Sequence, residues 1–446
     1  MEEWHKLTPE EKREERFKKW LSPQGVEFTS SEAEHLYKQR VQRIIDAIKL
    51  KEPDKVPVNI NMGVIPAFYS GLTLESVMHD YEKMRDAWIK FINEHDLDDF
   101  DTFDVRGVLP GRVFEILDFK MYKWPGHGVP PNSTMQYVEG EYMKADEYEY
   151  YLEDPADFQM KAYLPRVMGT LTPFQVLPSF RDIGGSFVAN LATYGTPEVE
   201  AAFNSLVEAG KEVIRWQKVV TELNKKVLAA GLPSFFAPQA GTPPEAPFDV
   251  IGNHLRGTVG IMMDMYRKPD ILLEALEKET RRQIKRIASP ANSAVSPVIF
   301  MGLHKGADGF MSRQQFTTFY WPFLKRIVLS YINEGFVPCL FAEGSYNSRL
   351  EIVKELPRGK VIWHLDQTDM AEAKKVLGDS ACIMGNVPSS LLVTGTSGDV
   401  KKYCKKLIEV AGKGGGYILA PGAVTNDAKL ENIYAMVEAV KEYGKY

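Results

Sequence analysis

The segments Val298-Ile-Phe-Met-Gly-Leu303 and Val337-Pro-Cys-Leu-Phe-Ala342 decide the fold. Each is a short apolar run of the kind that forms a buried strand, and residues 313–334 between them have the pattern of an amphipathic helix. Two short strands joined by a helix form a parallel pair, because a parallel connection has to return along the whole length of the sheet. This unit therefore predicts a parallel sheet covered by helices.

The same alternation of strand and helix extends in both directions from these two segments. Toward the C-terminus the predicted strands are 360–365, 381–384 and 416–420, and the predicted helices are 348–355, 370–377, 398–411 and 430–443. Toward the N-terminus the predicted strands are 56–62 and 172–177, and the predicted helices are 72–95 and 197–230. So many strand–helix units in one chain favour a (β/α)8 TIM barrel over an open sheet.

Two regions fall outside the barrel pattern. Residues 1–50 are predicted to be a helical extension, with Thr8-Pro-Glu-Glu11 as a helix start and Ser31-Glu-Ala-Glu34 as a capping box. Residues 51–446 then form the barrel. Within it, residues 122–157 are rich in Tyr, Glu and Met and are predicted to be an insertion near the barrel mouth.

Composition and charge exclude several classes of protein. The chain has 446 residues, of which 44% are hydrophobic and 26% charged, as in ordinary globular proteins. Its formal net charge of -6 argues against nucleic acid as a partner. Three cysteines do not make a disulfide scaffold. The charged N-terminus is unlike a secretory signal, and there is no apolar run of the ~18 residues that span a bilayer. We expect a cytoplasmic protein that is not bound to a membrane.

The active site of a TIM barrel lies at the carboxyl ends of its strands, so polar residues at those positions are the candidates. They are Asn59, Asn61, Gln175, Gln239, His304, Lys305, Asp308, Glu343, Asp366, Gln367 and Asn386. Asn59 and Asn61 are two apart on one strand and face the same side. On the inner side they would donate hydrogen bonds to substrate oxygens; the alternative is a solvated strand end.

A metal site is one use of these residues. His304, Glu343 and Cys382 come from three different predicted strands and would offer zinc an imidazole, a carboxylate and a thiolate, with a fourth position open. Such an ion is a Lewis acid, and His304 and Glu343 would then carry the catalysis. His364 in the neighbouring strand is the reserve ligand. The alternative is that Cys382 is a small buried hydrophobe and that His304 is merely hydrogen-bonded.

The two ends of the chain resemble one known family. The stretch Arg43-Ile-Ile-Asp-Ala-Ile-Lys-Leu-Lys-Glu-Pro-Asp-Lys-Val-Pro-Val58 and the stretch Gly415-Gly-Tyr-Ile-Leu-Ala-Pro-Gly422 are similar to the opening and closing motifs of the uroporphyrinogen decarboxylase superfamily. Gly385-Asn-Val-Pro388 and Tyr320-Trp-Pro-Phe-Leu-Lys-Arg326 resemble its internal motifs. The resemblance runs from about residue 40 to the end and implies a TIM barrel.

Two departures narrow the branch of the family. The arginine-rich motif that holds porphyrinogen carboxylates in true decarboxylases corresponds here to Asn59-Ile-Asn-Met-Gly-Val-Ile-Pro66, which has no arginine. The H-x-C zinc motif of the methylcobamide:coenzyme M methyltransferases corresponds to Phe341-Ala-Glu343, and their later Cys corresponds to Ala423. The resemblance therefore argues against both activities.

A third branch fits better. Leu303-His-Lys-Gly-Ala-Asp-Gly-Phe-Met-Ser312 and Ala342-Glu-Gly-Ser-Tyr-Asn-Ser-Arg-Leu350 resemble the methyltransferase components of bacterial O-demethylases. This implies transfer of a methyl group from a methoxylated aromatic to the cobalamin of a corrinoid protein, with zinc held by His304, Glu343 and Cys382. Tyr69 and Tyr346 would clamp the aromatic ring, with core packing as the alternative.

Other readings stay open at this point. A uroporphyrinogen decarboxylase would need to recruit Arg106, Arg181 and Arg256 for the substrate carboxylates. A methylated thiol or amine could replace the methoxylated aromatic as donor, and a non-catalytic binding protein could share the fold. Related barrels often pair, so a homodimer is one expected assembly.

Overall fold

Five parallel strands form the centre of the computed structural model, which describes residues 4–105, 108–183, 188–237, 243–287 and 295–446. The strands are β4 (Val298–Leu303), β5 (Val337–Ala342), β6 (Ile362–Leu365), β7 (Cys382–Met384) and β8 (Tyr417–Ile418). They are hydrogen-bonded in chain order and all run parallel. The deciding pair 298–303 and 337–342 is confirmed, because apolar runs of this length bury both faces of a strand.

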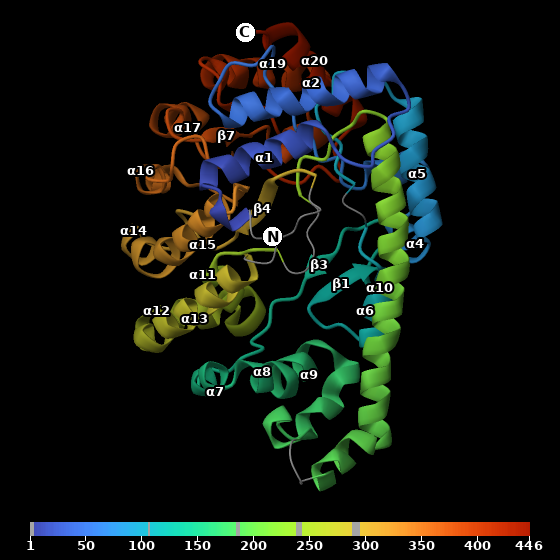
Figure 1. The fold of residues 1–446 in the computed structure, drawn as a ribbon, viewed down its shortest axis with the longest axis vertical. Coiled ribbons are helices and arrows are strands. Elements are labelled where there is room, and N and C mark those ends of the chain that lie inside the picture. The colour runs from blue at the N-terminus through green and yellow to red at the C-terminus, as the bar shows by residue number, and fades with distance from the viewer. Residues whose placement is uncertain (1–3, 106–107, 184–187, 238–242, 288–294) are drawn as a thin grey trace.

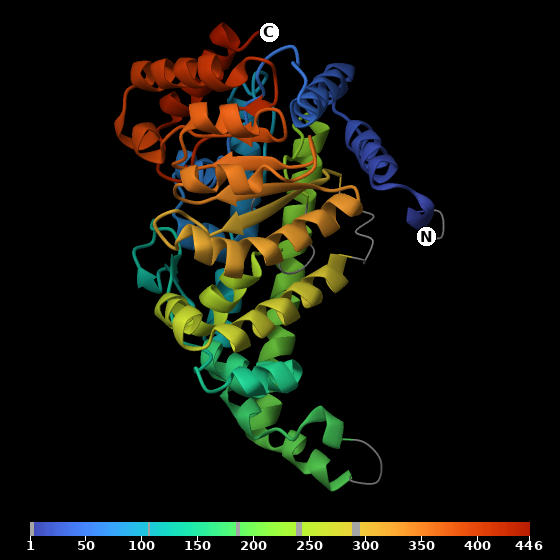
Figure 2. The same cartoon turned by 90° about the vertical axis from the view of Figure 1, so that its left-hand side faces the viewer.

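Helices connect these strands and cover the outer face of the sheet (Figures 1 and 2). They are α14 (Arg313–Gln315), η7 (Phe316–Tyr320), α15 (Trp321–Asn333), η8 (Asn347–Arg349), α16 (Leu350–Val353), α17 (Met370–Leu377), α18 (Ser389–Thr394), α19 (Ser397–Leu407), η9 (Ile408–Gly412) and α20 (Leu430–Tyr443). Side-chain caps fix several of their starts: Asp369 accepts two backbone N–H groups of α17, and Thr396 forms a capping box with Asp399.

Three extended segments continue the sheet at its two edges. Segment 56–62 lies beside β8, where Asn59 N donates to Leu419 O and Leu419 N donates to Pro57 O. Segment 233–237 lies beside β4, and its Ala237 N donates to Val298 O. Between the two edges, residues 100–105 bond to both segments, through Phe103 N to Pro233 O and through a side chain to Val58 N. The expected strand 56–62 is thus extended but forms only one isolated bridge, since Pro57 lacks an N–H to donate.

The N-terminal helices cover the amino-terminal end of the sheet. They are η1 (Trp4–Lys6), α1 (Pro9–Leu21) and α2 (Ser31–Ile48). Phe17, Trp20 and Tyr37 pack in one buried cluster with the first residues of the strands, such as Val298 and Cys382. Thr8 caps α1 as predicted, but α2 is capped by Ser30, one residue before the predicted position. The candidate polar residues therefore lie at the opposite, carboxyl-terminal end of the sheet, which these helices leave uncovered.

The N-terminal half holds the remaining elements. They are α3 (Ile65–Tyr69), α4 (Leu74–His79), α5 (Tyr81–Glu94), α6 (Gly111–Leu117), β1 (Tyr122–Pro125), β2 (Gly128–Val129), β3 (Gln136–Tyr137), α7 (Tyr148–Glu153), α8 (Pro155–Phe158), η2 (Gln159–Tyr163), α9 (Leu164–Val167), η3 (Gly169–Val176), η4 (Phe180–Asp182), η5 (Val188–Gly195), α10 (Pro197–Ala229), α11 (Pro247–Asp249), η6 (Val250–Arg256), α12 (Gly257–Arg267) and α13 (Pro269–Ile287). Here the expectations need two corrections. The predicted helix 72–95 breaks at Asp80, which caps α5 with its own side chain. The predicted strand 172–177 is part of the 3-10 helix η3, whose apolar residues pack on α10.

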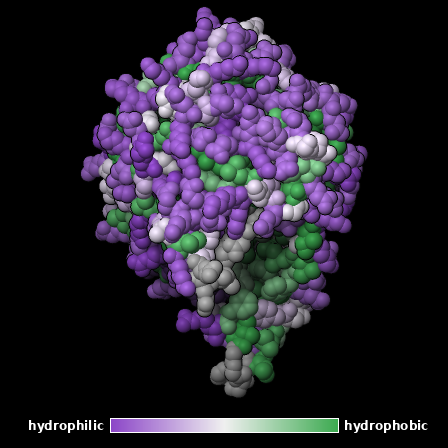
Figure 3. All heavy atoms as spheres, turned by 45° about the horizontal axis from the view of Figure 1, so that its top comes forward, coloured by the Kyte–Doolittle hydropathy of each residue, from purple (hydrophilic) through white to green (hydrophobic). Residues whose placement is uncertain are grey.

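The long helix α10 carries part of this half away from the sheet. It spans Pro197–Ala229 and reaches the tip formed by η2 to η5 at the bottom of the view (Figures 1 and 2). Large apolar side chains remain exposed along the tip and α10, and Figure 3 shows apolar surface gathered at this end of the face. They are Val176, Phe180, Val188, Leu191, Leu206, Val207 and Ile214. The tip thus packs one apolar face on α10 and leaves another in solvent.

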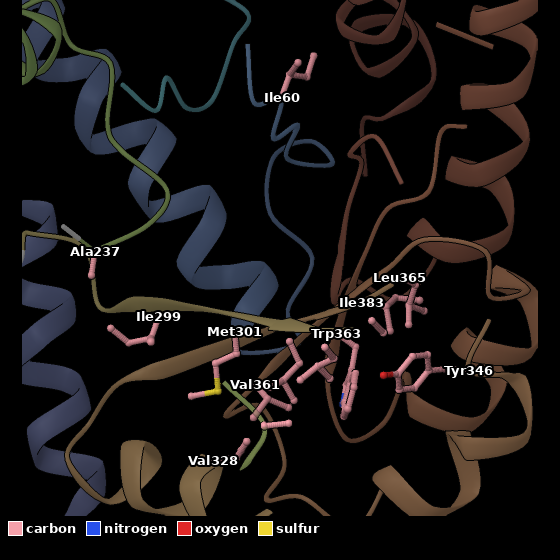
Figure 4. Close-up of a cluster of buried hydrophobic side chains, with 14 of the residues drawn as sticks. Ile60, Ala237, Ile299, Met301, Val328, Tyr346, Val361, Trp363, Leu365 and Ile383 are labelled. Carbon is pink, nitrogen blue, oxygen red and sulfur yellow. The ribbon is translucent and has the colours of Figure 1, made fainter. Parts of the chain in front are cut away.

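The main core lies between the sheet and its helices. Met301, Trp363 and Ile383 point from the strands toward the layer that contains Val328 of α15 and Tyr346, as Figure 4 shows. Alternate residues of the same strands point to the other side, which is the side closed by the N-terminal helices. In the described parts of the chain, no helix combines the length and the apolar character that crossing a membrane requires.

Candidate active site

Four of the predicted polar residues stand in one row just past the carboxyl ends of the parallel strands. They are His304 after β4, Glu343 after β5, Asp366 after β6 and Asn386 after β7. The parallel register of these strands brings the four positions to the same level across the sheet. The position of a residue after a predicted strand was therefore enough to select this row from the sequence.

His304 and Glu343 form a hydrogen-bonded pair in this row. His304 Nδ1 lies 2.8 Å from Glu343 Oε2, and the two side chains are 42% and 51% exposed. The hydrogen bond that His304 donates to Glu343 raises the pKa of His304 against the opposing effect of burial, and the same bond lowers the pKa of Glu343. Both shifts favour an imidazolium beside a carboxylate. The pair thus presents an accessible proton at the end of the sheet.

Asp249 fixes the backbone that carries His304. Its fully buried carboxylate accepts the backbone N–H groups of His304 and Lys305, each at 2.9 Å, and the hydroxyl of Tyr320 at 2.6 Å. Burial raises the pKa of Asp249, and its charge in turn raises the pKa of His304. Sequence reasoning missed this residue, although a lone acid between Phe248 and Val250 in an apolar run was a usable signal.

A cavity of about 800 Å³ opens beside the far end of the row. Its lining includes Asp366, Asn386 and Ser389. Asp366 Oδ2 accepts the N–H of Gly344, next to Glu343, and burial raises the pKa of Asp366. In the described structure Asn386 Oδ1 and Ser389 Oγ are buried without a hydrogen-bond partner. Buried acceptors of this kind are suited to a polar ligand.

A second cavity, of about 1090 Å³, lies on the His304 side. Its lining includes Glu245, His254, Tyr163 and Leu255. His254 Nε2 lies 3.1 Å from Glu245 Oε1, and the charge of Glu245 contributes to the raised pKa of His304. This cavity thus combines an aromatic and an aliphatic wall with charge close to the pair.

The predicted asparagines bond to the protein itself. Asn59 is buried, where its Oδ1 accepts from Thr102 Oγ1 at 2.8 Å and its Nδ2 points at Met384 Sδ. Asn61 is half-buried, and its Oδ1 accepts the N–H of Gly63 at 3.0 Å. Asn59 therefore joins neighbouring segments, and it is buried instead of standing at a solvated strand end.

The two predicted aromatic clamps lie apart from each other. Tyr69 is exposed on α3, donates to Glu94 at 2.9 Å and packs edge-on against His95. Tyr346 is almost fully buried and packs against Phe316 and Trp363. Tyr346 has the core position that was the alternative reading, since a buried ring in a packed core has no free face for a substrate.

The two predicted glutamines do not extend the site. Gln175 is exposed on η3, which contacts α9 and α10, so its expected position at a strand end is wrong. Gln239 lies outside the described residues.

Cys382 does not join His304 and Glu343. It is the first residue of β7, fully buried against the N-terminal helices, and burial raises the pKa of its thiol to about 12. The register places Cys382 level with Cys339, four residues before Glu343 on β5, which corresponds to roughly 13 Å along a strand. The expected ligand role of Cys382 is therefore corrected: it is the small buried hydrophobe of the alternative reading.

The predicted zinc site is not assembled around the pair. His364, the reserve ligand, faces the same side of the sheet as Phe341, and its Nε2 lies 2.8 Å from Pro421 O. Among the described residues, three ligand atoms of the His, Cys, Asp or Glu type lie within 4.8 Å of one another at His79, Glu115 and His127, far along the chain from the pair. His304 and Glu343 supply two of the three protein ligands that a catalytic zinc needs.

Comparisons with known proteins agree with this fold. Residues 237–443 match the family model described as uroporphyrinogen decarboxylase (URO-D). No curated protein matches the chain. One similar solved structure is a "methyltransferase from Methanosarcina mazei", at 18% identity and a TM-score of 0.56, covering 92% of this chain and 98% of that chain. At this identity the likeness concerns the fold. The matched residues 237–443, which carry the parallel sheet and the row of candidate residues, are similar to the uroporphyrinogen decarboxylase family.

Proposed function

We propose that this protein is a methyltransferase that moves a methyl group from a small methylated donor, a methoxylated aromatic, to the cobalt of a corrinoid carried by a partner protein. The observation that carries the proposal is the His304–Glu343 pair, which presents a proton at the carboxyl end of the sheet. The fold shared with a methyltransferase of Methanosarcina mazei supports it.

The chemistry needs an acid at the departing oxygen. A methyl aryl ether has a poor leaving group, and protonation of that oxygen as the carbon–oxygen bond breaks converts it into a phenol. In this proposal His304 donates that proton and Glu343 holds the imidazolium toward the substrate. The reduced corrinoid of the partner is the nucleophile, and the methyl carbon forms its new bond to the cobalt with the electron pair of the metal.

The cavity lined by Glu245 and His254 is the proposed site for the donor. Its volume of about 1090 Å³ is ample for a single substituted ring, and Tyr163 and Leu255 give it an apolar wall. The partner would approach the same carboxyl-terminal end of the sheet, where His304 and Glu343 are half open to solvent.

The described residues do not fit a zinc ion held by His304, Glu343 and Cys382, because the thiol lies at the other end of the strands. The proposal therefore assigns the stabilisation of the leaving group to the His304 proton. Zinc at this pair remains an outcome of the test below.

The decarboxylase reading has less support among the described arginines. Arg256 is 3% exposed and is already paired with Asp264 and Glu141. Arg181 is exposed on the tip at η4, and Arg106 lies outside the described residues. A substrate with several carboxylates needs free guanidinium groups near the site.

The test mixes the purified protein with a panel of methoxylated aromatics, methylated thiols and methylamines in the presence of reduced cobalamin. The expected result is loss of the cob(I)alamin absorption together with a demethylated phenol from one aromatic donor. His304→Ala should lower the rate by about 10²–10⁴-fold. His35→Ala, which changes an exposed histidine of α2, is the matched control.

Each other outcome has a defined meaning. Transfer from a thiol or amine donor would change the substrate class and keep the methyltransferase. A rate in His304→Ala equal to that of the wild type would refute the role of the pair. Release of carbon dioxide from uroporphyrinogen, with no methyl transfer, would overturn the proposal in favour of decarboxylation. One zinc per chain that disappears in both His304→Ala and Glu343→Ala would replace acid assistance by metal assistance.

A further inference from the structure

Two histidines and one glutamate meet in the N-terminal half of the chain, apart in sequence from the five parallel strands. They are His79 at the end of α4, Glu115 in α6 and His127 in the turn between β1 and β2. In Figure 1, α4, α6 and β1 lie in the same part of the molecule, and α4 contacts both α6 and β1. Three separately formed elements thus direct polar side chains to one point.

The two imidazoles approach the same carboxylate oxygen. His79 Nε2 lies 2.9 Å and His127 Nε2 lies 3.0 Å from Glu115 Oε1. The other oxygen of Glu115 accepts from Arg112 at 3.1 Å, so Oε1 alone faces the histidines. All three ligand atoms lie within 4.8 Å of one another.

A hydrogen bond to the other nitrogen of the His79 ring fixes the tautomer of its neutral form. His79 Nδ1 lies 2.8 Å from the carbonyl oxygen of Glu75. A carbonyl only accepts, so Nδ1 carries a proton, and in the neutral form of the ring the lone pair of Nε2 then faces Glu115 Oε1. Two acceptors at 2.9 Å repel each other unless a proton or a metal cation lies between them.

The surroundings hold the His79 ring in this position. A Cβ added at Gly111 would lie 2.7 Å from His79 Cε1, so only glycine fits against the ring. The ring of His127 stacks on Trp124 with centroids 4.8 Å apart. A ring N–H donated to a backbone carbonyl is the usual support of a histidine that binds a metal.

We propose that His79, Glu115 and His127 form a binding site for a divalent transition metal of the zinc class. Two imidazoles and one carboxylate are a ligand set that zinc takes, with a fourth position for water. At about 2.0–2.1 Å from a tetrahedral ion the ligand atoms lie about 3.3 Å apart. The two separations from Glu115 Oε1, 2.9 and 3.0 Å, need to open by a few tenths of an ångström, and the two imidazole nitrogens lie within 4.8 Å of each other. The bound ion joins α4 and α6 to the β1–β2 turn.

This site is independent of the proposed methyl transfer. It uses no residue of the row that contains His304, and its test reads metal binding rather than activity. Failure of the metal site would leave the methyl-transfer proposal intact, and failure of methyl transfer would leave the metal site intact.

The direct test is calorimetric titration of Zn²⁺ into the full chain after treatment with a chelator. We expect about one Zn²⁺ per chain, and affinity at least about tenfold weaker in His79→Ala and in His127→Ala. His35→Ala and His304→Ala should bind as the wild type does. Binding in His79→Ala that equals the wild type, or no binding by the wild type, would overturn the proposal; the second result would mean that a proton lies between His79 and Glu115.

A second measurement covers the case in which a variant folds poorly. His127 is 44% exposed on a turn, so His127→Gln should keep the fold. Zn²⁺ should raise the Tm of the wild type and not that of His127→Gln, since a ligand stabilises the state that binds it. Co²⁺ should give the visible absorption of a tetrahedral nitrogen and oxygen site in the wild type alone. An equal rise of Tm in both proteins would place the metal elsewhere.

Discussion

The proton on His304 links the proposed reaction to pH. Glu343 raises the pKa of His304 above its usual 6.5, and an acid acts only while it is protonated. We therefore expect the rate to be high at low pH within the stable range and to fall as pH rises through the elevated pKa of His304. Glu343→Gln removes the largest cause of the shift, so the midpoint of the fall should move to lower pH. A pH–rate profile for both proteins measures this, and an unchanged midpoint would contradict it.

Asp249 is buried and also affects the pKa of His304. It holds the backbone of His304 and Lys305, and its charge is a further cause of the raised pKa of His304. Asp249→Asn should lower the rate and shift the alkaline midpoint of the profile to lower pH, by less than Glu343→Gln does. A loss of stability without any movement of the midpoint would show a structural role alone. Asp308→Asn, which changes another acid of the same loop that bonds to Ser348, is the matched control.

The contribution of individual elements to stability is clearest at α2. Arg43 of this helix is 5% exposed and forms an ion pair with Asp101, which is 1% exposed and also accepts the N–H of Val58. Removing one partner of a buried pair leaves an uncompensated charge. Arg43→Ala should lower the free energy of unfolding by about 3–5 kcal/mol. Denaturant unfolding measures this free energy. The control is Lys38→Ala, which removes an exposed ion pair with Glu34 on the same helix and should change the free energy of unfolding by less than about 1 kcal/mol.

Elements whose ends carry local signals were predictable from the sequence. The helices Met370–Leu377 and Leu430–Tyr443 were predicted to the residue, because their apolar periodicity and their flanking residues agree. The apolar run 172–177 was predicted as a strand and is a 3-10 helix, because Pro173 cannot join a ladder and the run packs on α10 instead. Tertiary packing decided what local propensity left open.

The site was predictable to the same extent and for the same reason. His304, Glu343 and Asp366 follow strands directly and Asn386 follows β7 after one glycine, so their common level at the carboxyl end is a consequence of the parallel register. Cys382 was misplaced because it lies at the start of a predicted strand instead of following one, so the same rule puts it at the amino-terminal end of the sheet. His79, Glu115 and His127 meet only after three elements have folded together, which no spacing in the sequence indicates.

On the scale of the whole molecule, the two ends of the sheet differ in composition: one is apolar and buried, and the other is polar and partly exposed. The amino-terminal end is closed by Phe17, Trp20 and Cys382 in an apolar cluster, and the carboxyl-terminal end carries His304 and Glu343 in contact with solvent. In TIM-barrel proteins the first end contributes stability and the second carries the chemistry. Changes at the two ends should therefore affect different properties.

Cys382→Ser and His304→Ala test this separation. Cys382→Ser places a hydroxyl in the apolar cluster, where an unsatisfied polar group costs about 1–3 kcal/mol, so it should lower the free energy of unfolding and leave the rate of methyl transfer and the metal content unchanged. His304→Ala removes a side chain that is 42% exposed, so it should abolish most of the rate and change the free energy of unfolding by less than about 0.5 kcal/mol. Denaturant unfolding, the transfer rate and elemental analysis of both variants give the comparison. A lower rate of methyl transfer in Cys382→Ser, measured under conditions where the variant stays folded, would contradict the separation, because the register places Cys382 at the amino-terminal end of the sheet.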